Sequence, residues 1–194
     1  DDDSLKIDGV SINEYKKYDI RKLVAYVPQE HLLFARSVKD NILMVKIENA
    51  HIDLNYAIKM ADFEKDLVFL EDGLDTIVGE YGVTLSGGQK QRLLIARALA
   101  NHPEILILDD SSSALDYKTD ANLRKAILQN LKDTTSIIVT QRVSSVMNAD
   151  LIIVLEEGEI IGMGNHQDLL NTCEVYKEIS DCLLYTSPSP RDRS

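Results

Sequence analysis

The sequence has no long apolar run. A helix needs about 20 mostly apolar residues to cross a bilayer, and no segment of the 194 residues approaches that length. The densest apolar stretches, residues 105–108 and 151–155, have the length of strands. A function at a membrane would therefore require an anchor from another segment or another chain.

Basic charge and cysteine are also scarce. Lys and Arg total 21 against 32 Asp and Glu, which gives a formal net charge of -11. A nucleic-acid surface needs a basic patch to displace counterions from phosphates, so this balance argues against a nucleic-acid partner. Cys173 and Cys182 are too few for a disulfide framework or a cysteine metal site. The apolar share of 44% and the charged share of 27% are typical of a globular chain.

Turn residues and hydrophobic periodicity predict an alternation of strands and helices. The predicted elements are a hairpin over 6–12 around Asp8-Gly9, a strand over 23–27, helices over 37–70 and 86–100, a strand over 105–109, a helix over 119–131, a strand over 136–140 and a hairpin over 151–161. This order predicts an α/β fold with a parallel sheet covered on both faces. The helical stretch interrupts the alternation and is interpreted as a lobe inserted into that core.

The predicted organisation is a core of residues 1–36 and 101–181, a helical subdomain of residues 37–100 and a tail of residues 182–194. Residues 182–192 show neither a helical nor a strand period. They resemble the conceptual translation of a transposase sequencing adapter, so we assign no function to the tail.

The segment Leu85-Ser86-Gly87-Gly88-Gln89 precedes a strongly helical run. Ser86 is suited to cap the helix, and the glycines let a phosphate approach the backbone closely. The helix dipole adds attraction for an anion, so the segment predicts an anion cradle. For a bare Ser-Gly-Gly, an ordinary capped helix would be the simpler interpretation. The helix itself is apolar nearly all round over 91–99, which predicts that it is buried.

Two acidic residues follow the apolar strand 105–108, namely Asp109 and Asp110. A buried parallel strand delivers such carboxylates to its C-terminal end, where open parallel sheets bind ligands. An isolated string of this kind would more often be a strand that ends in a solvated turn. The surrounding motifs favour the functional interpretation.

The full string VTLSGGQKQRLLIARAL resembles the signature motif of ATP-binding-cassette (ABC) ATPases, and ILILDD resembles their Walker B motif. Gln29 in VPQE resembles the Q-loop, Asp116 in SSSALD the D-loop, and Gln141 the switch position. The resemblance covers residues 4–181 and implies an exporter-type nucleotide-binding domain. Its expected fold is a P-loop NTPase-like (RecA-like) core with an inserted helical subdomain.

The resemblance also implies ligands and partners. In the family, the signature binds the γ-phosphate of ATP held by the opposite nucleotide-binding domain, so Leu85–Gln89 would act across a head-to-tail dimer. Asp109 would hold Mg²⁺, Gln29 would contact Mg²⁺ and the attacking water, and Asp116 would meet the partner domain. A transmembrane domain fused upstream would place the protein at the cytoplasmic face of the cell membrane.

Three departures from the family pattern stand out. The sequence contains no GxxxxGK[ST], the P-loop whose backbone and lysine hold phosphates, and we expect it to lie upstream. Asp110 stands in place of the usual catalytic glutamate, and Gln141 in place of the usual histidine. Both replacements beside an unaltered signature resemble the degenerate-site subunit of a heterodimeric exporter.

Two other functions stay open. A soluble ABC ATPase that acts on nucleic acid or ribosomes would share the signature and Walker B. An importer ATPase with separate membrane subunits would share them too. The exporter-like segments 27–34 and 78–82 favour the exporter over both.

Without a P-loop, the chain alone should bind ATP very weakly, because the main backbone cradle for the β- and γ-phosphates is missing. Titration of the 194-residue chain with a fluorescent nucleotide should show no saturation in the micromolar range. A micromolar affinity would contradict this prediction.

Overall fold

The computed structural model forms two compact units, Asp1–Val139 and Thr140–Ser194. It describes residues 5–29, 32–44, 52–79, 84–109, 120, 121, 125, 127, 131 and 133–185. Each unit is treated by itself below.

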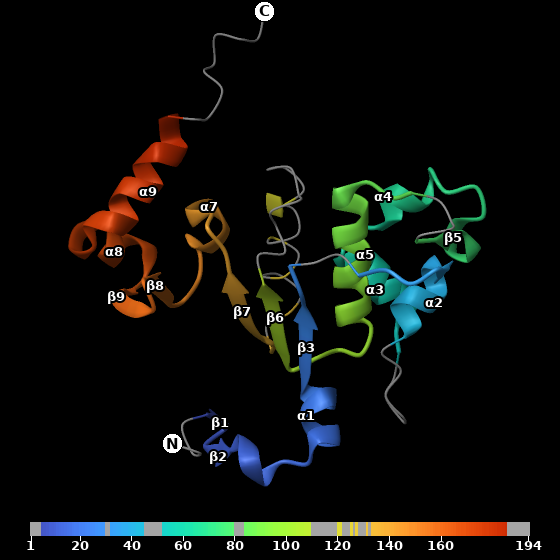
Figure 1. Ribbon diagram of the computed structural model, residues 1–194, viewed down its shortest axis with the longest axis horizontal. Coiled ribbons are helices and arrows are strands. Elements are labelled where there is room, and N and C mark those ends of the chain that lie inside the picture. Colours follow the sequence, from blue (N-terminus) through green and yellow to red (C-terminus); the bar gives the residue numbers. More distant parts are fainter. Residues whose placement is uncertain are drawn as a thin grey trace, which may run out of the picture. The chain divides into compact units, whose positions relative to one another are not determined.

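The N-terminal unit is built on a parallel sheet. Its strands β3 (Val24–Val27), β6 (Ile105–Asp109) and β7 (Thr135–Val139) lie side by side in that order (Figure 1). Val24 pairs with Ile105, which in turn pairs with Thr135, so the strands start level and end at one edge. The predicted α/β fold with a parallel sheet is confirmed.

Helix α5 (Gly87–Leu99) packs against this sheet and is buried. Leu93, Ile95 and Ala96 have no exposed surface. One side of α5 contacts β3, while other sides contact α2 (Val38–Leu43) and α3 (Leu54–Met60). The prediction that this helix is buried is therefore confirmed, because neighbouring elements cover its apolar sides.

A buried ion pair joins α5 to α4 (Glu64–Leu67). Arg92 donates from Nε to Asp66 Oδ2 at 2.6 Å and from Nη2 to Asp66 Oδ1 at 2.7 Å. The two side chains are only 8% and 5% exposed. A bidentate pair of this kind satisfies both charged groups within the core and fixes their relative orientation.

The helical segment is closed at its base by two short strands. β4 (Arg36–Ser37) pairs antiparallel with β5 (Ile77–Val78), which follows the 3₁₀ turn η2 (Gly73–Asp75). The N–H of Val38 then donates to the carbonyl of Thr76 at 3.0 Å. This pairing was not predicted, because strands of two residues carry no periodicity. The predicted subdomain limits of 37 and 100 remain a prediction.

A hairpin begins the described chain, with β1 (Lys6–Ile7) paired to β2 (Val10–Ser11). Its turn residues Asp8 and Gly9 have φ values of 50° and 81°, as a type I′ turn requires. The predicted hairpin is confirmed, except that a 3₁₀ turn, η1 (Ile12–Glu14), replaces its last residue. Helix α1 (Lys17–Leu23), which was not predicted, then leads into β3.

The C-terminal unit pairs β8 (Ile152–Glu156) with β9 (Glu159–Gly164), which confirms the predicted hairpin around Glu157-Gly158. The described part of this unit also contains three helices, namely α7 (Val143–Val146), α8 (His166–Thr172) and α9 (Glu174–Tyr185). Its core consists of Val143, Ile152, Leu169, Cys173 and Tyr176.

One expectation about the tail is wrong. Residues 182–185 were predicted to lack helical structure, but α9 continues through them to Tyr185. The reason is visible in the sequence, where apolar residues at 175, 179, 182 and 183 repeat at helical spacing. The assignment of residues 182–194 as a non-native tail remains a prediction.

Two further predictions, a helix over 119–131 and the absence of a membrane-spanning helix, can be compared only with the described residues. Residues 120, 121, 125 and 127 are helical, in agreement with a helix over 119–131, whose other residues lie outside the described ones except for residue 131. Within the described ranges, no helix has both the length and the apolar character needed to span a bilayer.

Replacement Asp66→Asn should lower the free energy of unfolding by about 3 kcal/mol, because it leaves the buried guanidinium of Arg92 without a counter-charge. Urea denaturation of the chain measures the loss. The matched control is Lys65→Gln, which removes the exposed Lys65–Asp62 pair and should cost less than about 0.5 kcal/mol. Equal losses in the two variants would contradict the prediction.

Candidate functional site

The predicted ligand residues Gln29 and Asp109 lie at the C-terminal edge of the sheet. Asp109 is the last residue of β6, and Gln29 is an exposed residue just beyond the end of β3. Because β3 and β6 are neighbouring parallel strands, their C-terminal ends meet at the same edge. The structure therefore brings these two residues to one side of the sheet, where open parallel sheets bind ligands.

Asp109 has a hydrogen-bond partner that the sequence did not reveal. The hydroxyl of Tyr26 donates to Asp109 Oδ2 at 2.8 Å. This hydrogen bond, together with burial and the negative charge of Asp109, raises the pKa of Tyr26 above its ordinary value of 10.0. The register of β3 against β6 was needed to find this contact, because the two residues lie 83 positions apart.

The predicted anion cradle is a capped helix N-terminus. Ser86 Oγ accepts from the N–H of Gln89 at 3.3 Å, and Gln89 Oε1 accepts from the N–H of Ser86 at 2.9 Å. This reciprocal capping box leaves the N–H groups of Gly87 and Gly88 without a hydrogen bond to any described residue. Leu85 is buried and anchors the segment, while Ser86 and Gly87 are exposed.

The helix presents its cradle at the same end of the N-terminal unit as the strand ends. α5 runs antiparallel to β6, since the short connection 100–104 joins the end of one to the start of the other (Figure 1). The N–H of Glu104, next to β6, donates to the carbonyl of Leu23 at 2.9 Å and fixes this connection beside β3. The LSGGQ cradle, which attracts anions, and the carboxylate of Asp109, which attracts metal ions, therefore lie at the same end of the N-terminal unit.

A polar network ties α5 to the segment that follows Gln29. Arg97 donates to the carbonyl of Asn41 at 2.7 Å, to Asn41 Oδ1 at 2.8 Å and to the carbonyl of Leu32 at 3.1 Å. The fully buried Asn41 also exchanges hydrogen bonds with the backbone of Phe34, both at 3.0 Å. The segment 32–37 is thereby held at a fixed distance from α5.

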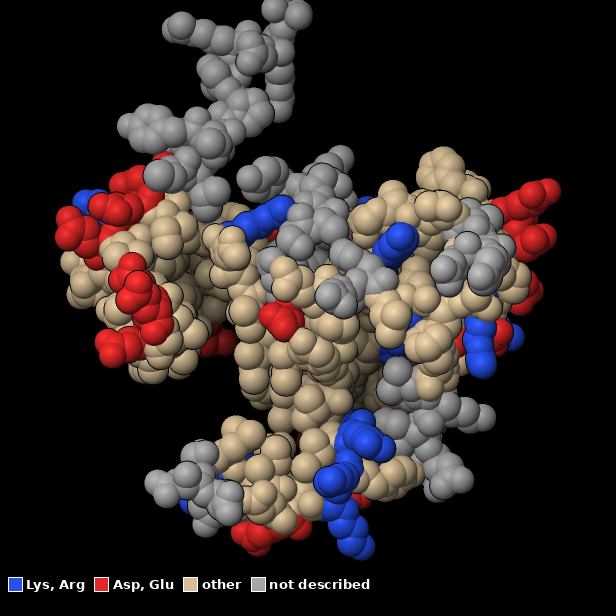
Figure 2. All heavy atoms as spheres, viewed as in Figure 1, with Lys and Arg blue, Asp and Glu red and all other residues tan. Residues whose placement is uncertain are grey.

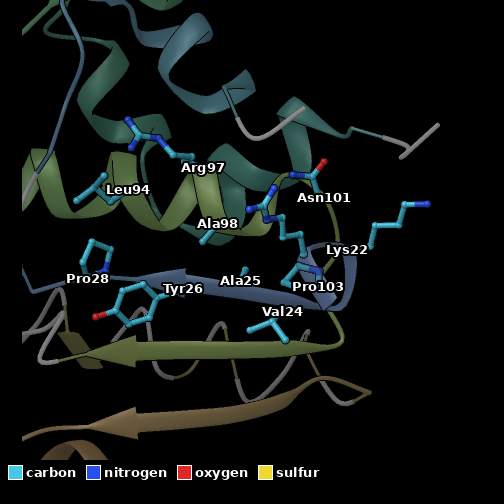
Figure 3. A pocket seen from close by; sticks show the side chains of 11 residues that line it. Lys22, Val24, Ala25, Tyr26, Pro28, Leu94, Arg97, Ala98, Asn101 and Pro103 are labelled. Carbon is cyan, nitrogen blue, oxygen red and sulfur yellow. The ribbon is translucent and has the colours of Figure 1, made fainter. Parts of the chain in front are cut away.

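A small cavity lies between β3 and α5 (Figure 3). Its volume is about 110 Å³, well below the roughly 300 Å³ at which ligand pockets begin. In Figure 3, Ala25 points toward α5, whereas the Tyr26 ring lies on the β6 side of the strand with its hydroxyl toward the strand ends. Asp109 is not among the residues that line the cavity, and the cavity is too small for a nucleotide.

The carboxylate of Asp109 fits Mg²⁺ as one ligand among several. Its Oδ1 atom accepts no hydrogen bond from the described part of the chain, which leaves that oxygen available. Among the described residues, no group of three or more His, Cys, Asp or Glu forms a metal cage. Mg²⁺ is commonly held by one or two carboxylates together with phosphates and waters, so a single carboxylate at an open edge suits it.

The other predicted site residues lie outside the described residues or in the C-terminal unit. Asp110 and Asp116 lie outside the described residues. Gln141 belongs to the C-terminal unit and is exposed, in a short link where the N–H of Arg142 donates to Thr140 Oγ1 at 3.1 Å. Their roles remain predictions.

The family model described as "ABC transporter" matches residues 1–113, more than half of the chain. The chain therefore belongs to the ABC transporter family, in which it matches the ATP-binding domain. Members of this domain family bind nucleotide and act as ATPases. The resemblance predicted from LSGGQ and the Walker B-like strand is confirmed.

The chain is similar to named ABC transporters and to a solved ABC exporter. The chain is 51% identical over 175 residues to the Bacillus subtilis protein "Probable multidrug resistance ABC transporter ATP-binding/permease protein YheI". It is 42% identical over 171 residues to "ABC transporter B family member 1" of Dictyostelium discoideum, covering 88% of this chain and 19% of that protein. A solved structure, "Structure of a bacterial Atm1-family ABC exporter with ATP bound", matches with a TM-score of 0.83 and 32% identity.

These proteins are much longer than the chain. The chain aligns over 90% of its own length but 30% of the Bacillus subtilis relative. For the solved exporter the shares are 92% and 32%. The named relative combines an ATP-binding part with a permease part, and the chain corresponds to the former.

Replacement Ser86→Ala should lower the free energy of unfolding by about 1 kcal/mol, because it removes the acceptor for the Gln89 N–H. Urea denaturation of the chain measures the change. Ser86→Thr keeps the hydroxyl and should remain within a few tenths of a kcal/mol, roughly. An Ala variant as stable as the wild type would contradict a stabilising capping box.

Proposed function

We propose that the chain is the ATP-binding part of an ABC exporter, in which ATP binding and hydrolysis at a dimer interface drive transport across a membrane. The observation that carries the proposal is the shared direction of the LSGGQ cradle and the Asp109 edge within the N-terminal unit. The similarity to a protein named as a probable multidrug resistance ABC transporter and to a solved ABC exporter supports it. The location that follows is the cytoplasmic face of the cell membrane, with a transmembrane domain fused in the longer protein.

Asp109 and Gln29 are the proposed metal-site residues. Asp109 would bind Mg²⁺ directly or through water, and Gln29 would contact the ion and the attacking water. The ion supplies positive charge that neutralises charge developing on the phosphates. The residues of this chain contribute by holding one carboxylate and one amide at the open edge of the sheet.

The segment Leu85–Gln89 is the proposed site for the γ-phosphate of the partner's ATP. Its open N–H groups and the positive end of the α5 dipole would bind phosphate oxygens. Such a site completes a second domain's nucleotide, so the proposed partner is another nucleotide-binding domain in a head-to-tail dimer. Asp116 would contact that partner.

The proposed dimer is a heterodimer in which this chain's own ATP is hydrolysed slowly. Asp110 is one methylene shorter than glutamate, so its carboxylate retreats by about 1.5 Å. A misplacement of about 1 Å can cost on the order of 10²-fold in rate. Gln141 donates a hydrogen bond but carries no positive charge near neutral pH, unlike a protonated histidine.

A function on nucleic acid has less support. On the face shown in Figure 2, the basic side chains of described residues are scattered apart from a group over α1, and acidic side chains cover much of the C-terminal unit. Helix α1 carries Arg21 and Lys22 in its last turn. A short helix with so few cations offers few phosphate contacts.

The proposal is tested in the full-length protein, reconstituted with its partner. The partner subunit carries a replacement of its own catalytic carboxylate, so that the remaining ATP hydrolysis comes from this chain's site. Asp110→Glu combined with Gln141→His should then raise turnover, on the order of 10²-fold. No increase would overturn the degenerate-site assignment.

A second variant tests the signature in the same heterodimer, with the partner site intact. Ser86→Gly should lower hydrolysis at the partner's site, because the hydroxyl that would bind its γ-phosphate is lost. Glycine at this cap position costs only a few tenths of a kcal/mol of stability, roughly, so unfolding does not explain the loss. Wild-type hydrolysis in this variant would argue against action in trans.

A further inference from the structure

The Tyr26–Asp109 contact follows from the register of the sheet. Tyr26 pairs with Ile107, and side chains alternate between the faces of a strand. Tyr26, Ile107 and Asp109 therefore share one face, with Asp109 as the diagonal neighbour of Tyr26. A diagonal neighbour is within reach of an aromatic side chain, and the hydroxyl of Tyr26 lies 2.8 Å from Asp109 Oδ2.

Burial does not explain why the Tyr26 ring lies there. The residue is 54% exposed, in contrast to its neighbour Val27 at 1%. In this position the hydroxyl of Tyr26 donates a hydrogen bond to one carboxylate oxygen of Asp109. The hydrogen bond to Oδ2 restricts the rotation of the Asp109 carboxylate, and Oδ1 accepts no hydrogen bond from the described residues.

We infer that Tyr26 is a positioning residue that orients the carboxylate of Asp109 for the metal ion bound with ATP. The inference rests on the proposed metal role of Asp109. Carboxylates that bind metals are themselves held by hydrogen bonds, and loss of such an outer partner costs about 10- to 100-fold in metal affinity. Tyr26 is half exposed, so water can partly replace its hydroxyl, and the lower end of that range applies.

A purely structural role predicts a different outcome. If the hydroxyl only fastened β3 to β6, its removal would lower stability and leave metal affinity alone. The strands are already paired over four positions, from Val24–Ile105 to Val27–Leu108, so one exposed hydrogen bond adds little to their association. Metal affinity is therefore the readout that separates positioning from fastening.

The experiment uses the full-length protein in its proposed dimer, with the partner's own metal-binding carboxylate replaced by an amide. Mn²⁺ serves as the probe at saturating non-hydrolysable ATP analogue, and the fall of the free Mn²⁺ electron paramagnetic resonance signal measures binding. Tyr26→Phe should raise the Kd for Mn²⁺ about tenfold. The melting temperature should change by no more than about 4 °C.

Three further variants complete the design. Tyr18→Phe, a control at an exposed tyrosine of α1, should leave Mn²⁺ binding unchanged. Asp109→Asn should weaken it by at least as much as Tyr26→Phe. The double variant Tyr26→Phe/Asp109→Asn should bind no more weakly than Asp109→Asn alone, because the hydroxyl acts through the carboxylate.

The outcomes separate the two proposals. If Asp109→Asn weakens Mn²⁺ binding while Tyr26→Phe leaves it unchanged or tightens it, the role of Tyr26 is overturned and the metal role of Asp109 stands. If Asp109→Asn itself has no effect, the proposed metal site is wrong, and the role of Tyr26 is overturned with it.

Discussion

The burial of α5 is the constraint on which the N-terminal unit depends. A helix that is apolar on nearly every side must be covered on every side. The sheet covers one side through β3, and α2 and α3 cover others. The same packing sets the direction of the helix, so that its capped N-terminus and the strand ends open toward the same end of the unit. The packing that forms the core therefore also positions the candidate site.

Polar groups inside this core add direction to the packing. Apolar contacts are non-directional, and alone they would let α5 slide or rotate against its neighbours. Arg92 and Arg97 remove that freedom, because the buried guanidinium of Arg92 and the half-buried guanidinium of Arg97 need specific acceptors. Asp66 supplies them on α4, and Asn41 supplies them at the start of the helical segment. The position of the LSGGQ cradle is therefore fixed by hydrogen-bond geometry as well as by shape.

Local signals in the sequence were sufficient for much of the fold and for part of the site. The turns at Asp8-Gly9 and Glu157-Gly158 could be predicted because glycine, and to a lesser degree aspartate, accepts the positive φ values that the hairpins need. Ser86 was predicted to cap the helix, and in the structure it does so in a capping box with Gln89. Non-local contacts were not predictable in this way. The β4–β5 pair, the Arg92–Asp66 ion pair and the Tyr26–Asp109 hydrogen bond all depend on a register or packing that no single segment contains.

The β4–β5 pair brings together the two ends of the helical segment between these strands, residues 38–76. This segment can therefore be exchanged as a unit. Its two ends emerge side by side, joined by the Arg36–Val78 pairing and by the Val38 to Thr76 hydrogen bond. An insertion whose ends already meet can be lengthened or replaced at its far tip with little added entropy of closure. The base of the segment then holds its place on the sheet while its outer surface varies. A chain built in this manner can adapt to different neighbours without rebuilding the sheet and α5.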